Sequence, residues 1–485
     1  MDIEEFRKRG YEAVDRICKY YKELDNHNVL PNVRPGYLKE LLPKEAPEEP
    51  ESFDAIQSDI ETKIIPGVTH WQSPNFFAFY PANSSFPGIL GDMYSDMFGC
   101  IGFNWITSPA CTELETIVLD WVGKLIGLDK TFLSDGYGGG VIQGTASEAT
   151  LVALIAARQR VIDKYKAEGL TEEQLHVISS RLIAYGSTQT HSCLKKSTMI
   201  ANVRFRALST DEKFSLRGDT IKREIEKDIS QGLIPCFLNG TIGTTSSAAV
   251  DHISELADAI QGTDVWLHID AAYAGSALVC PEYQHYLDGV DRADSFNFNM
   301  HKWLLTNFDT SCLWVKRRKL LISALTITPE FLKNPASESG LVLDYRDWQL
   351  PLGRRFRSLK IWFVLRTYGA KGLREHIRKS ISLAKHFQNR LLSEYSDLFA
   401  ISTEQAFSLV CFHVIPNVKS RKTSNELTEE VYNRVNETQK IYLTHTKLND
   451  QFVIRFVVGS PWTAKEHVDR AFDLIVKITK EAISH

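Results

Sequence analysis

The segment from Gly138 to Ser147 carries residue types that could bind a phosphate group. Its glycine-rich start leads through a short β-rich run to Gly144-Thr-Ala-Ser147, and a strongly helical sequence follows. Thr145 and Ser147 bring hydroxyls to the start of this helix, with Ser147 as the expected N-cap, and the free N–H groups of a first helical turn attract anions. The segment has neither the Gly-Lys-Ser/Thr ending of a Walker A loop nor a dinucleotide GxGxxG pattern. Taken alone, a plain helix cap after a turn also explains it.

A second segment places a carboxylate where an apolar strand is expected to end. Residues Val265–Asp270 have the sequence Val-Trp-Leu-His-Ile-Asp, and two alanines follow. In a parallel sheet the carboxyl ends of the strands line the ligand crevice, and a buried carboxylate there needs a partner. The small residues after Asp270 leave flat space that suits a planar ligand. An aspartate that simply caps a helix is the alternative.

The third segment, Asn297–Leu305, carries a lysine at a position suited to covalent chemistry. Lys302 follows a β-rich run about 30 residues after Asp270 and precedes an apolar stretch. Partial burial lowers the pKa of a lysine amine and makes it a better nucleophile. A His-Lys pair by itself is more typical of a solvated lysine.

Together, the three segments meet the needs of one cofactor, pyridoxal 5′-phosphate. This molecule has a phosphate, a ring nitrogen that must be held protonated and an aldehyde that condenses with an amine. A phosphate cradle, an acidic strand end and a lysine after the next strand follow one another here in a single region. No cluster of His, Cys and Asp has the spacing of a metal site, so no metal is expected.

The elements that must position these residues follow from the hydrophobic pattern. Between residues 140 and 316, short β-rich runs alternate with helix-compatible stretches, which predicts an α/β domain with a mainly parallel sheet and helices on both faces. Residues 1–30 have the period of an amphipathic helix, and Thr112 and Glu115 have the spacing of a capping box. A long helix after Gly353, then strands and a closing helix, indicate a smaller α+β domain. We expect three parts: an N-terminal helical segment at 1–85, a large domain at 86–355 and a small domain at 356–485.

Length and composition exclude several classes of protein. The chain has 485 residues, a formal net charge of −4 and 43% hydrophobic residues, which is ordinary for a globular protein. It has no basic tract for nucleic acid and no apolar run of the ~18 residues that a membrane helix needs. The N-terminus has no secretory signal, and the eight cysteines are scattered without a CxxC pair. We expect a cytoplasmic protein with reduced thiols and with no nucleic-acid or membrane partner.

From about residue 1 to 480, the chain resembles the pyridoxal-phosphate-dependent aromatic L-amino-acid decarboxylases, the group II decarboxylases. The motifs that carry the resemblance are HWQSPNFFAFYP, IGFNWITSPACTELE, VIQGTASEATLVAL, HIDAAYAGSA, NMHKWLLTNFDTSCLWVK and WQLPLGRRFRSLKIWFVLR. The resemblance implies the aminotransferase type I fold, whose large domain has a mainly parallel seven-stranded sheet. It also implies an obligate homodimer with active sites at the interface, in which the N-terminal helices wrap around the partner subunit.

The resemblance assigns roles to individual residues. Lys302 matches the family's Schiff-base lysine, Asp270 the acid that pairs with the pyridinium nitrogen, and His191 the histidine that stacks on the ring. The other implied cofactor contacts are Thr145, Ala146, Ser147, Asn299 and His301, with Thr245 and Ala272 close to the ring. The family's aromatic substrate pocket matches Trp71, Phe79, Tyr80, Pro81, Ala82, Ile101 and Phe103, with Gly353 near the ring.

The chain departs from the decarboxylase pattern at one catalytic position. Phe331, in the loop at 322–340, stands where the family has a tyrosine that protonates Cα and completes amine formation. Losing a positioned general acid typically slows that step by about 10²–10⁴-fold, or about 3–5 kcal/mol. Molecular oxygen can then intercept the reaction and give an aromatic acetaldehyde, ammonia and hydrogen peroxide alongside CO2.

The same tyrosine-to-phenylalanine change marks the aromatic acetaldehyde synthases of this family, so we expect an aldehyde synthase. The alternative is a conventional decarboxylase that forms an arylalkylamine from tryptophan, phenylalanine or tyrosine. In that case Phe331 merely packs in its loop, and water or His191 delivers the proton. The sequence leaves both open.

The implied pocket favours substrates without ring hydroxyls. Ala82 replaces a threonine found in catechol-handling animal relatives, and Phe79 offers no hydroxyl. Gly353 leaves room that a serine, typical of phenol-handling plant relatives, would narrow. An apolar, roomy pocket favours tryptophan or phenylalanine over dopa.

Overall fold

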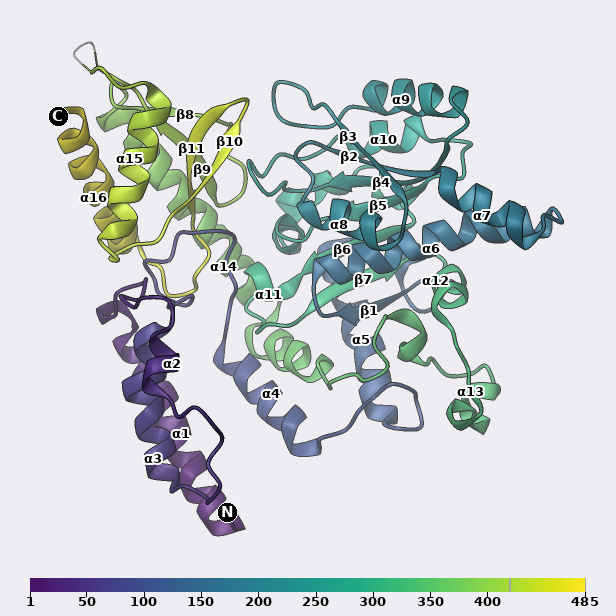
Figure 1. Ribbon diagram of the computed structural model, residues 1–485, viewed down its shortest axis with the longest axis horizontal. Helices are drawn as coiled ribbons and strands as arrows, with labels where there is room; N and C mark the ends of the chain where they lie inside the picture. Colours follow the sequence, from purple (N-terminus) through teal and green to yellow (C-terminus); the bar gives the residue numbers. More distant parts are fainter. Residues whose placement is uncertain (418–419, 485) are drawn as a thin grey trace. The chain divides into compact units, whose positions relative to one another are not determined.

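Seven β-rich segments pair into one sheet in the computed structural model, which describes residues 1–417 and 420–484 (Figure 1). The sheet order is β1-β7-β6-β5-β4-β2-β3. The strands are β1 (Gly139–Gln143), β2 (Leu182–Ser187), β3 (Arg204–Leu208), β4 (Ile234–Thr241), β5 (Trp266–Asp270), β6 (Ser295–Asn299) and β7 (Ser311–Val315). Strand β7 runs antiparallel to both of its neighbours, and the other four pairs are parallel. The expected α/β fold with a mainly parallel seven-stranded sheet is therefore confirmed.

This sheet belongs to the larger of two compact units, Ala82–Lys379, which we call unit 2. Strands β1, β2, β5, β6 and β7 are buried along their whole length, as expected for a sheet that is covered on both faces. The helices of this unit are α4 (Phe86–Phe98), α5 (Pro109–Ile126), α6 (Ala146–Ala167), α7 (Glu172–Arg181), α8 (Ser192–Ile200), α9 (Gly218–Ser230), α10 (Ile253–Ala259), α11 (Met300–Trp303), α12 (Arg318–Leu325) and α13 (Pro335–Glu338).

Helix α6 is the central helix of unit 2. Its apolar residues, among them Val152 and Leu154, share one buried cluster with Phe237 of β4, Trp266 of β5 and Leu313 of β7. The helix follows β1 directly, so its first turn lies beside the carboxyl end of that strand. Strand β1 points in the same direction as β4, β5 and β6, because two antiparallel pairings separate it from β6. All these carboxyl ends therefore lie at one edge of the sheet.

The second unit, unit 1, combines Met1–Pro81 with the chain from Ser380 onward. Its antiparallel sheet has the order β10-β11-β9-β8. The strands are β8 (Phe399–Ile401), β9 (Leu409–Val414), β10 (Thr444–Leu448) and β11 (Gln451–Val457), and the helices are α1 (Ile3–Glu23), α2 (Tyr37–Leu41), α3 (Phe53–Asp59), α15 (Ser424–Glu437) and α16 (Lys465–Ser484). Helix α14 (Ser358–Glu394), interrupted at Gly369 where φ is 61°, runs from unit 2 into unit 1. The three-part division at residues 85 and 355 stays a prediction.

Two helices of unit 2 begin earlier than the sequence predicts. Helix α5 starts at Pro109, with Ser108 as its N-cap, so Thr112 and Glu115 do not form the expected capping box. Helix α6 starts at Ala146, and its cap is Thr145, whose hydroxyl accepts from the N–H of Glu148, rather than Ser147. In both helices the residue before the first turn has extended backbone and a hydroxyl side chain, which is the geometry that a cap needs.

Three further observations concern membrane-spanning helices, thiols and metal-binding groups. None of the helices within residues 1–417 and 420–484 combines the length and apolar character of a membrane crossing. All eight cysteines have free thiols, and six of them are buried. Within the same residues, no group of three or more His, Cys, Asp or Glu side chains is placed to hold a metal ion.

Candidate active site

Three of the sequence-predicted residues meet at the edge where β4, β5 and β6 end. The N–H of Ile242 donates to the carbonyl of Asp270 at 2.9 Å, and the N–H of Ala271 donates to Asn297 at 2.8 Å. Beyond the strand ends, Asn299 donates its N–H to the carbonyl of Ala272 at 3.1 Å. These bonds place Asp270, Ala272 and Asn299 side by side, as expected for the crevice outside the carboxyl ends of parallel strands.

Asp270 is a buried carboxylate at the end of β5. Its side chain is only 4% exposed, and Oδ1 accepts the N–H of Ala272 at 2.9 Å. Among residues 1–417 and 420–484, no lysine, arginine or histidine forms an ion pair with it. A buried carboxylate is costly unless it is paired. The site therefore suits a ligand that brings a positive charge, such as a protonated ring nitrogen.

The first turn of α6 offers hydrogen-bond donors to an anion. Thr145 and Ala146 are half-buried, and the side chain of Ser147 is exposed at the second position of the helix. Glu148 is the acidic residue of this turn, and its carboxylate accepts the N–H of Gly144 at 2.8 Å. A helix of 22 residues directs its positive dipole end and free N–H groups at this point.

His301 is fixed as a neutral hydrogen-bond donor. Its Nδ1 accepts the backbone N–H of Thr310 at 2.7 Å, so the ring hydrogen is on Nε2. Burial, together with the neighbouring positive charge of Lys302, lowers the pKa of His301 to about 3. The ring therefore stays neutral at physiological pH and offers one N–H, which fits a contact to a phosphate oxygen.

Lys302 lies on the short helix α11, directly after β6, and is half-buried. The segment that follows Ala82 is bonded to this turn. Asn83 donates its N–H to the carbonyls of His301 at 3.0 Å and Lys302 at 3.2 Å, and its side chain accepts the N–H of Leu305 at 3.2 Å. The predicted pocket residue Ala82 is thereby held next to the turn that carries the lysine.

His191 caps α8 with its own side chain. Nδ1 accepts the N–H of Cys193 at 3.1 Å, so the hydrogen is on Nε2 at the exposed side of the ring. Burial lowers the pKa of His191. The negative charge of Asp270 raises this pKa, and the positive charge of Lys302 lowers it. These mutual influences place His191, Asp270 and Lys302 in one electrostatic environment.

Thr245 is exposed in the turn after β4. Its neighbour Gly243 has φ of 84°, and a Cβ atom there would lie 2.5 Å from that of Ala274. Only glycine allows this close approach, so the turn that presents Thr245 packs directly on the segment after Asp270.

The predicted substrate-pocket residues form two groups, one in each unit. In unit 2, Gly102 donates its N–H to Arg354 at 3.2 Å, and a Cβ atom on Gly353 would lie 3.5 Å from Cγ2 of Ile101. The carbonyl of Phe103 accepts the N–H of Arg346 at 2.9 Å. These bonds hold Ile101 and Phe103 beside Gly353.

In unit 1, the ring of Trp71 stacks on that of Phe79 with centroids 5.5 Å apart and planes 11° apart. The guanidinium of Arg455 lies 5.0 Å from the centroid of the Tyr80 ring. Pro81 packs so closely on Gly459 that a Cβ atom there would lie 2.3 Å from the proline ring. The aromatic segment is thus firmly built into its own unit.

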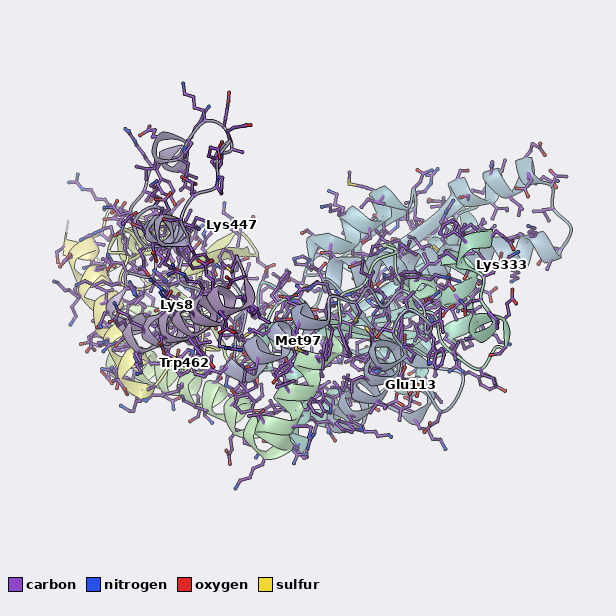
Figure 2. All side chains as sticks on the ribbon, turned by 90° about the horizontal axis from the view of Figure 1, so that it is seen from below. Lys8, Met97, Glu113, Lys333, Lys447 and Trp462 are labelled. Carbon is purple, nitrogen blue, oxygen red and sulfur yellow. The ribbon has the colours of Figure 1, made fainter. Side chains whose placement is uncertain are left out.

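Phe331 is not brought together with Lys302, Asp270 and His191 within one chain. Its ring is 79% exposed, whereas the next residue, Leu332, is buried. Helix α13, which follows this loop, lies far from α11 at the edge of unit 2 (Figure 1). The exposed Lys333, two residues further on, marks the loop in Figure 2.

Sequence reasoning missed the buried ionic residues that hold the site's frame. Glu115 of α5 accepts the N–H of Ile142 at 2.8 Å and pairs with Arg354, both side chains being at most 1% exposed. Arg357 donates to the carbonyl of Ile142 and to Asp309, each at 3.0 Å. The arginine-rich RRFR run after Gly353 was a signal for them, since arginines inside an apolar stretch need buried partners.

The residues present fit pyridoxal phosphate. A helix start with exposed hydroxyl and N–H donors suits its phosphate, and the unpaired Asp270 suits its ring nitrogen. One buried side-chain atom, Oδ1 of Asn299, has no hydrogen-bond partner in the described residues and lies at the same strand edge. The individual roles of the residues stay predictions.

The chain is similar to known proteins in both sequence and structure. Residues 35–415 match the model of the pyridoxal-dependent decarboxylase conserved domain. The chain is 51% identical to tryptophan decarboxylase 2 of Oryza sativa subsp. japonica over 480 residues, 98% of this chain and 94% of the relative. It is 49% identical over 480 residues to phenylacetaldehyde synthase of Arabidopsis thaliana, with 98% and 96% covered. The crystal structure of Oryza sativa TDC with PLP and tryptamine superposes with a TM-score of 0.95 at 40% identity, covering 100% of this chain and 99% of that one.

Proposed function

Because the chain belongs to the pyridoxal-dependent decarboxylase family, we propose that it converts aromatic L-amino acids to aromatic acetaldehydes. It is a carbon–carbon lyase of the aromatic L-amino-acid decarboxylase group, with pyridoxal 5′-phosphate as cofactor. Relatives of about half-identical sequence include both decarboxylases and an aldehyde synthase, so the family alone does not choose between amine and aldehyde. The observation that carries the choice is Phe331.

The proposed cofactor-holding residues are those of the strand edge. Lys302 would hold the cofactor covalently through its amine, Asp270 would pair with the ring nitrogen, and His191 would stack on the ring. Thr145, Ala146, Ser147, Asn299 and His301 would hold the phosphate, with Thr245 and Ala272 beside the ring. When bound, the cofactor supplies an electron-withdrawing ring that takes up the electron pair released as CO2 leaves the substrate.

Asp270 and His191 perform different tasks in this proposal. Asp270 holds a proton on the ring nitrogen, because a buried carboxylate favours a positive charge beside it. His191 is a neutral ring with its N–H on Nε2, so it can orient an acceptor such as the substrate carboxylate. With Phe331 unable to donate a proton, His191 is the side chain that the proposal leaves to donate one to Cα.

Phe331 cannot return a proton to the carbon that has lost CO2, since a phenyl ring has no acidic hydrogen. Oxygen then takes two electrons and two protons and becomes hydrogen peroxide. The overall reaction balances as amino acid, O2 and water giving aldehyde, CO2, ammonia and hydrogen peroxide. With Phe331 in place of a tyrosine, the enzyme is thus expected still to decarboxylate its substrate but to release a different product.

A conventional decarboxylase is the alternative, and His191 is the observation that favours it. Its ring hydrogen is on Nε2, and its pKa responds to the charges of Asp270 and Lys302. If His191 protonates Cα efficiently, the amine forms despite Phe331.

Product analysis under air and under nitrogen separates these two functions. Purified holoenzyme is incubated with tryptophan, phenylalanine, tyrosine and dopa, and aldehyde, amine and peroxide are quantified. We expect aldehyde and peroxide in air, and a strong loss of aldehyde under nitrogen. Amine without peroxide in air would establish the conventional decarboxylase instead.

We further propose that tryptophan or phenylalanine is preferred over dopa. Ala82 is held beside the lysine turn and carries no hydroxyl, and a Cβ atom on Gly353 would be in ordinary contact with Ile101 at 3.5 Å. Neither position has a side chain that can accept a hydrogen bond from a catechol. A higher kcat/KM for dopa than for tryptophan and phenylalanine would contradict the preference.

The working form is proposed to be a homodimer in which each loop serves the other subunit. Helix α1 has no buried residue, and its apolar side chains Ile3, Phe6 and Tyr11 are 66–74% exposed. In unit 2, Met97, labelled in Figure 2, and Phe98 at the end of α4 are also exposed. Large apolar side chains exposed on a helix, as found separately in each unit, are typical of a protein interface. A second copy would also explain how Phe331, remote from its own Lys302, reaches an active site.

A further inference from the structure

A row of buried polar side chains runs beneath Asp270 on one face of the seven-stranded sheet. Residues two apart on a strand point to the same face, and residues in register on neighbouring strands do so too. The row therefore comprises Asn239 and Thr241 of β4, His268 and Asp270 of β5, and Ser295 and Asn297 of β6. None of these residues is more than 4% exposed. The face is the one that α6 covers, because Phe237 and Trp266, the next residues along it, pack against α6.

Within this polar row the hydrogen bonds have a fixed direction. Trp266 donates its Nε1–H to Ser295 Oγ at 2.7 Å, and the same oxygen lies 2.7 Å from Nδ1 of His268. A buried hydroxyl hydrogen without an acceptor is costly, and His268 Nδ1 is the acceptor within reach. Ser295 therefore donates to Nδ1, and the hydrogen of the His268 ring must be on Nε2.

The surroundings of His268 keep the ring neutral and in one plane. Phe237 stacks on it, with ring centroids 5.7 Å apart and planes 29° apart. Full burial lowers the pKa of His268 to about 4, while Asp270 and Asn297 act in the opposite direction. In the described part of the chain, neither Nε2 nor the amide atoms of Asn297 has a well-formed hydrogen bond. The unpartnered N–H of His268 therefore lies in the same polar row as Asp270.

We propose that His268 is a positioning residue for Asp270, with Trp266 and Ser295 fixing its tautomer. The inference rests on the proposed role of Asp270 opposite the cofactor's ring nitrogen. An N–H group in the same buried row as the carboxylate favours the ionised form of that carboxylate. The N–H of Ala272 holds Oδ1 from another direction. Because His268 is neutral, it adds no positive charge that would compete with a protonated ring nitrogen.

The test measures the protonation of the cofactor rather than activity. Holoenzyme is prepared with pyridoxal phosphate that carries nitrogen-15 in its ring, and the solid-state NMR shift of that nitrogen is recorded. His268→Leu removes the N–H donor, whereas His268→Gln keeps an amide donor near the position of Nε2. We expect the leucine variant to move the signal towards the unprotonated form and to bind the cofactor at least about tenfold more weakly. The glutamine variant should retain most of the wild-type signal and affinity.

His376→Leu is the matched control, because His376 is a buried histidine of α14 outside the polar row. It should reduce stability while leaving the nitrogen signal and the cofactor affinity unchanged. If His268→Leu does not fold, Ser295→Ala, which removes the donor to Nδ1, should give a smaller change of the same sign.

Three results would overturn the inference. The first is a folded His268→Leu or Ser295→Ala protein whose nitrogen signal and cofactor affinity are those of the wild type. The second is a change of the nitrogen signal in His376→Leu that equals the change in His268→Leu. The third is a wild-type chain that takes up no cofactor, which refutes the proposed function itself. Because the first two leave the wild-type holoenzyme intact, the two kinds of failure are distinguishable.

Discussion

At the residue scale, the chemistry depends on a few side chains whose types the sequence already indicates. Lys302 and Asp270 were predicted from strand ends and spacing and Asn299 from the family resemblance, and each lies at, or shortly after, the end of a strand at the same edge of the sheet. His268 was not predicted, although it alternates with Trp266 and Asp270 on one strand. Its tautomer depends on Ser295 from a neighbouring strand, and a cross-strand contact cannot be deduced from the pattern of a single strand.

Phe331→Tyr is expected to shift the main product from aldehyde to amine. A phenol returns a proton to Cα, and restoring a general acid accelerates that step by roughly 10²–10⁴-fold. The ratio of amine to aldehyde, measured by chromatography in air, checks this. Phe331→Leu is the control, because it alters the side chain without adding a proton donor and should stay an aldehyde former. An unchanged product ratio in the tyrosine variant would remove Phe331 from the account.

Gly353→Ser is expected to favour phenolic substrates. A Cβ atom at this position would meet Cγ2 of Ile101 at 3.5 Å, an ordinary contact, so the variant should fold normally. The added hydroxyl can bond a phenol, and the added volume narrows the space for an indole. We expect the ratio of kcat/KM for tyrosine to that for tryptophan to rise about 10-fold. Gly353→Ala separates volume from hydroxyl: a ratio that rises equally in both variants would exclude the hydrogen bond.

At the element scale, strands were more predictable than helix starts. All seven strands of the large sheet correspond to β-rich runs, and five of them are buried along their whole length, as expected of strands inside a covered sheet. Helix α5 is capped by Ser108 rather than by Thr112, and helix α6 by Thr145 rather than by Ser147, because several hydroxyl residues near each start could serve as the cap. Strand β8 was missed because it has three residues and pairs only with β9.

Glu115→Gln tests the buried ion pair that ties α5 to the segment carrying Gly353. The variant leaves the guanidinium of Arg354 buried without a counter-charge, which typically costs about 3–5 kcal/mol in unfolding free energy. Urea denaturation followed by circular dichroism measures this loss. Glu113→Gln is the control, because Glu113 is an exposed glutamate of the same helix and should change stability little. A loss below about 1 kcal/mol for Glu115→Gln would show that the pair is not needed.

At the scale of the whole molecule, the structure has two compact units, and the predicted three-part division at residues 85 and 355 stays a prediction. The sequence indicated a large α/β part and a smaller α+β part, but it could not show that residues 1–81 join the C-terminal segment. That association depends on side chains far apart in the chain, such as Thr463, which donates to the carbonyl of Pro74 at 2.8 Å.

Buried histidines predict that the protein loses stability in mild acid. Burial lowers the pKa of His268 to about 4 and those of His301 and His376 to about 3. Their pKa in an unfolded chain is about 6.5, so below that pH the unfolded state binds more protons than the folded one. Stability should therefore fall between about pH 6.5 and 4, by up to about 1.4 kcal/mol per pH unit for each histidine.

Denaturation midpoints at pH 7.5, 6.0 and 5.0 test this dependence. His376→Gln should show a shallower decline than the wild type, because one buried histidine no longer contributes. Identical pH profiles for the two proteins would contradict the assignment of His376.

A hybrid dimer tests whether the Phe331 loop acts in the partner subunit. One chain carries Lys302→Ala and the other Phe331→Tyr, and two affinity tags isolate the hybrid. Its only intact Lys302 then lies in the chain whose own loop has the tyrosine. If loops act across the interface, this site receives Phe331 and forms aldehyde. Formation of amine instead would show that each loop serves its own chain.

The central claim is that Lys302 holds pyridoxal phosphate covalently at the edge formed by β4, β5 and β6. Borohydride reduction of the purified holoenzyme, followed by proteolysis and mass spectrometry, locates that bond most directly. We predict a single pyridoxyl-phosphate adduct on the peptide that contains Lys302, and no adduct in Lys302→Ala. An adduct on another lysine, or none on any peptide of the cofactor-saturated protein, would contradict the account.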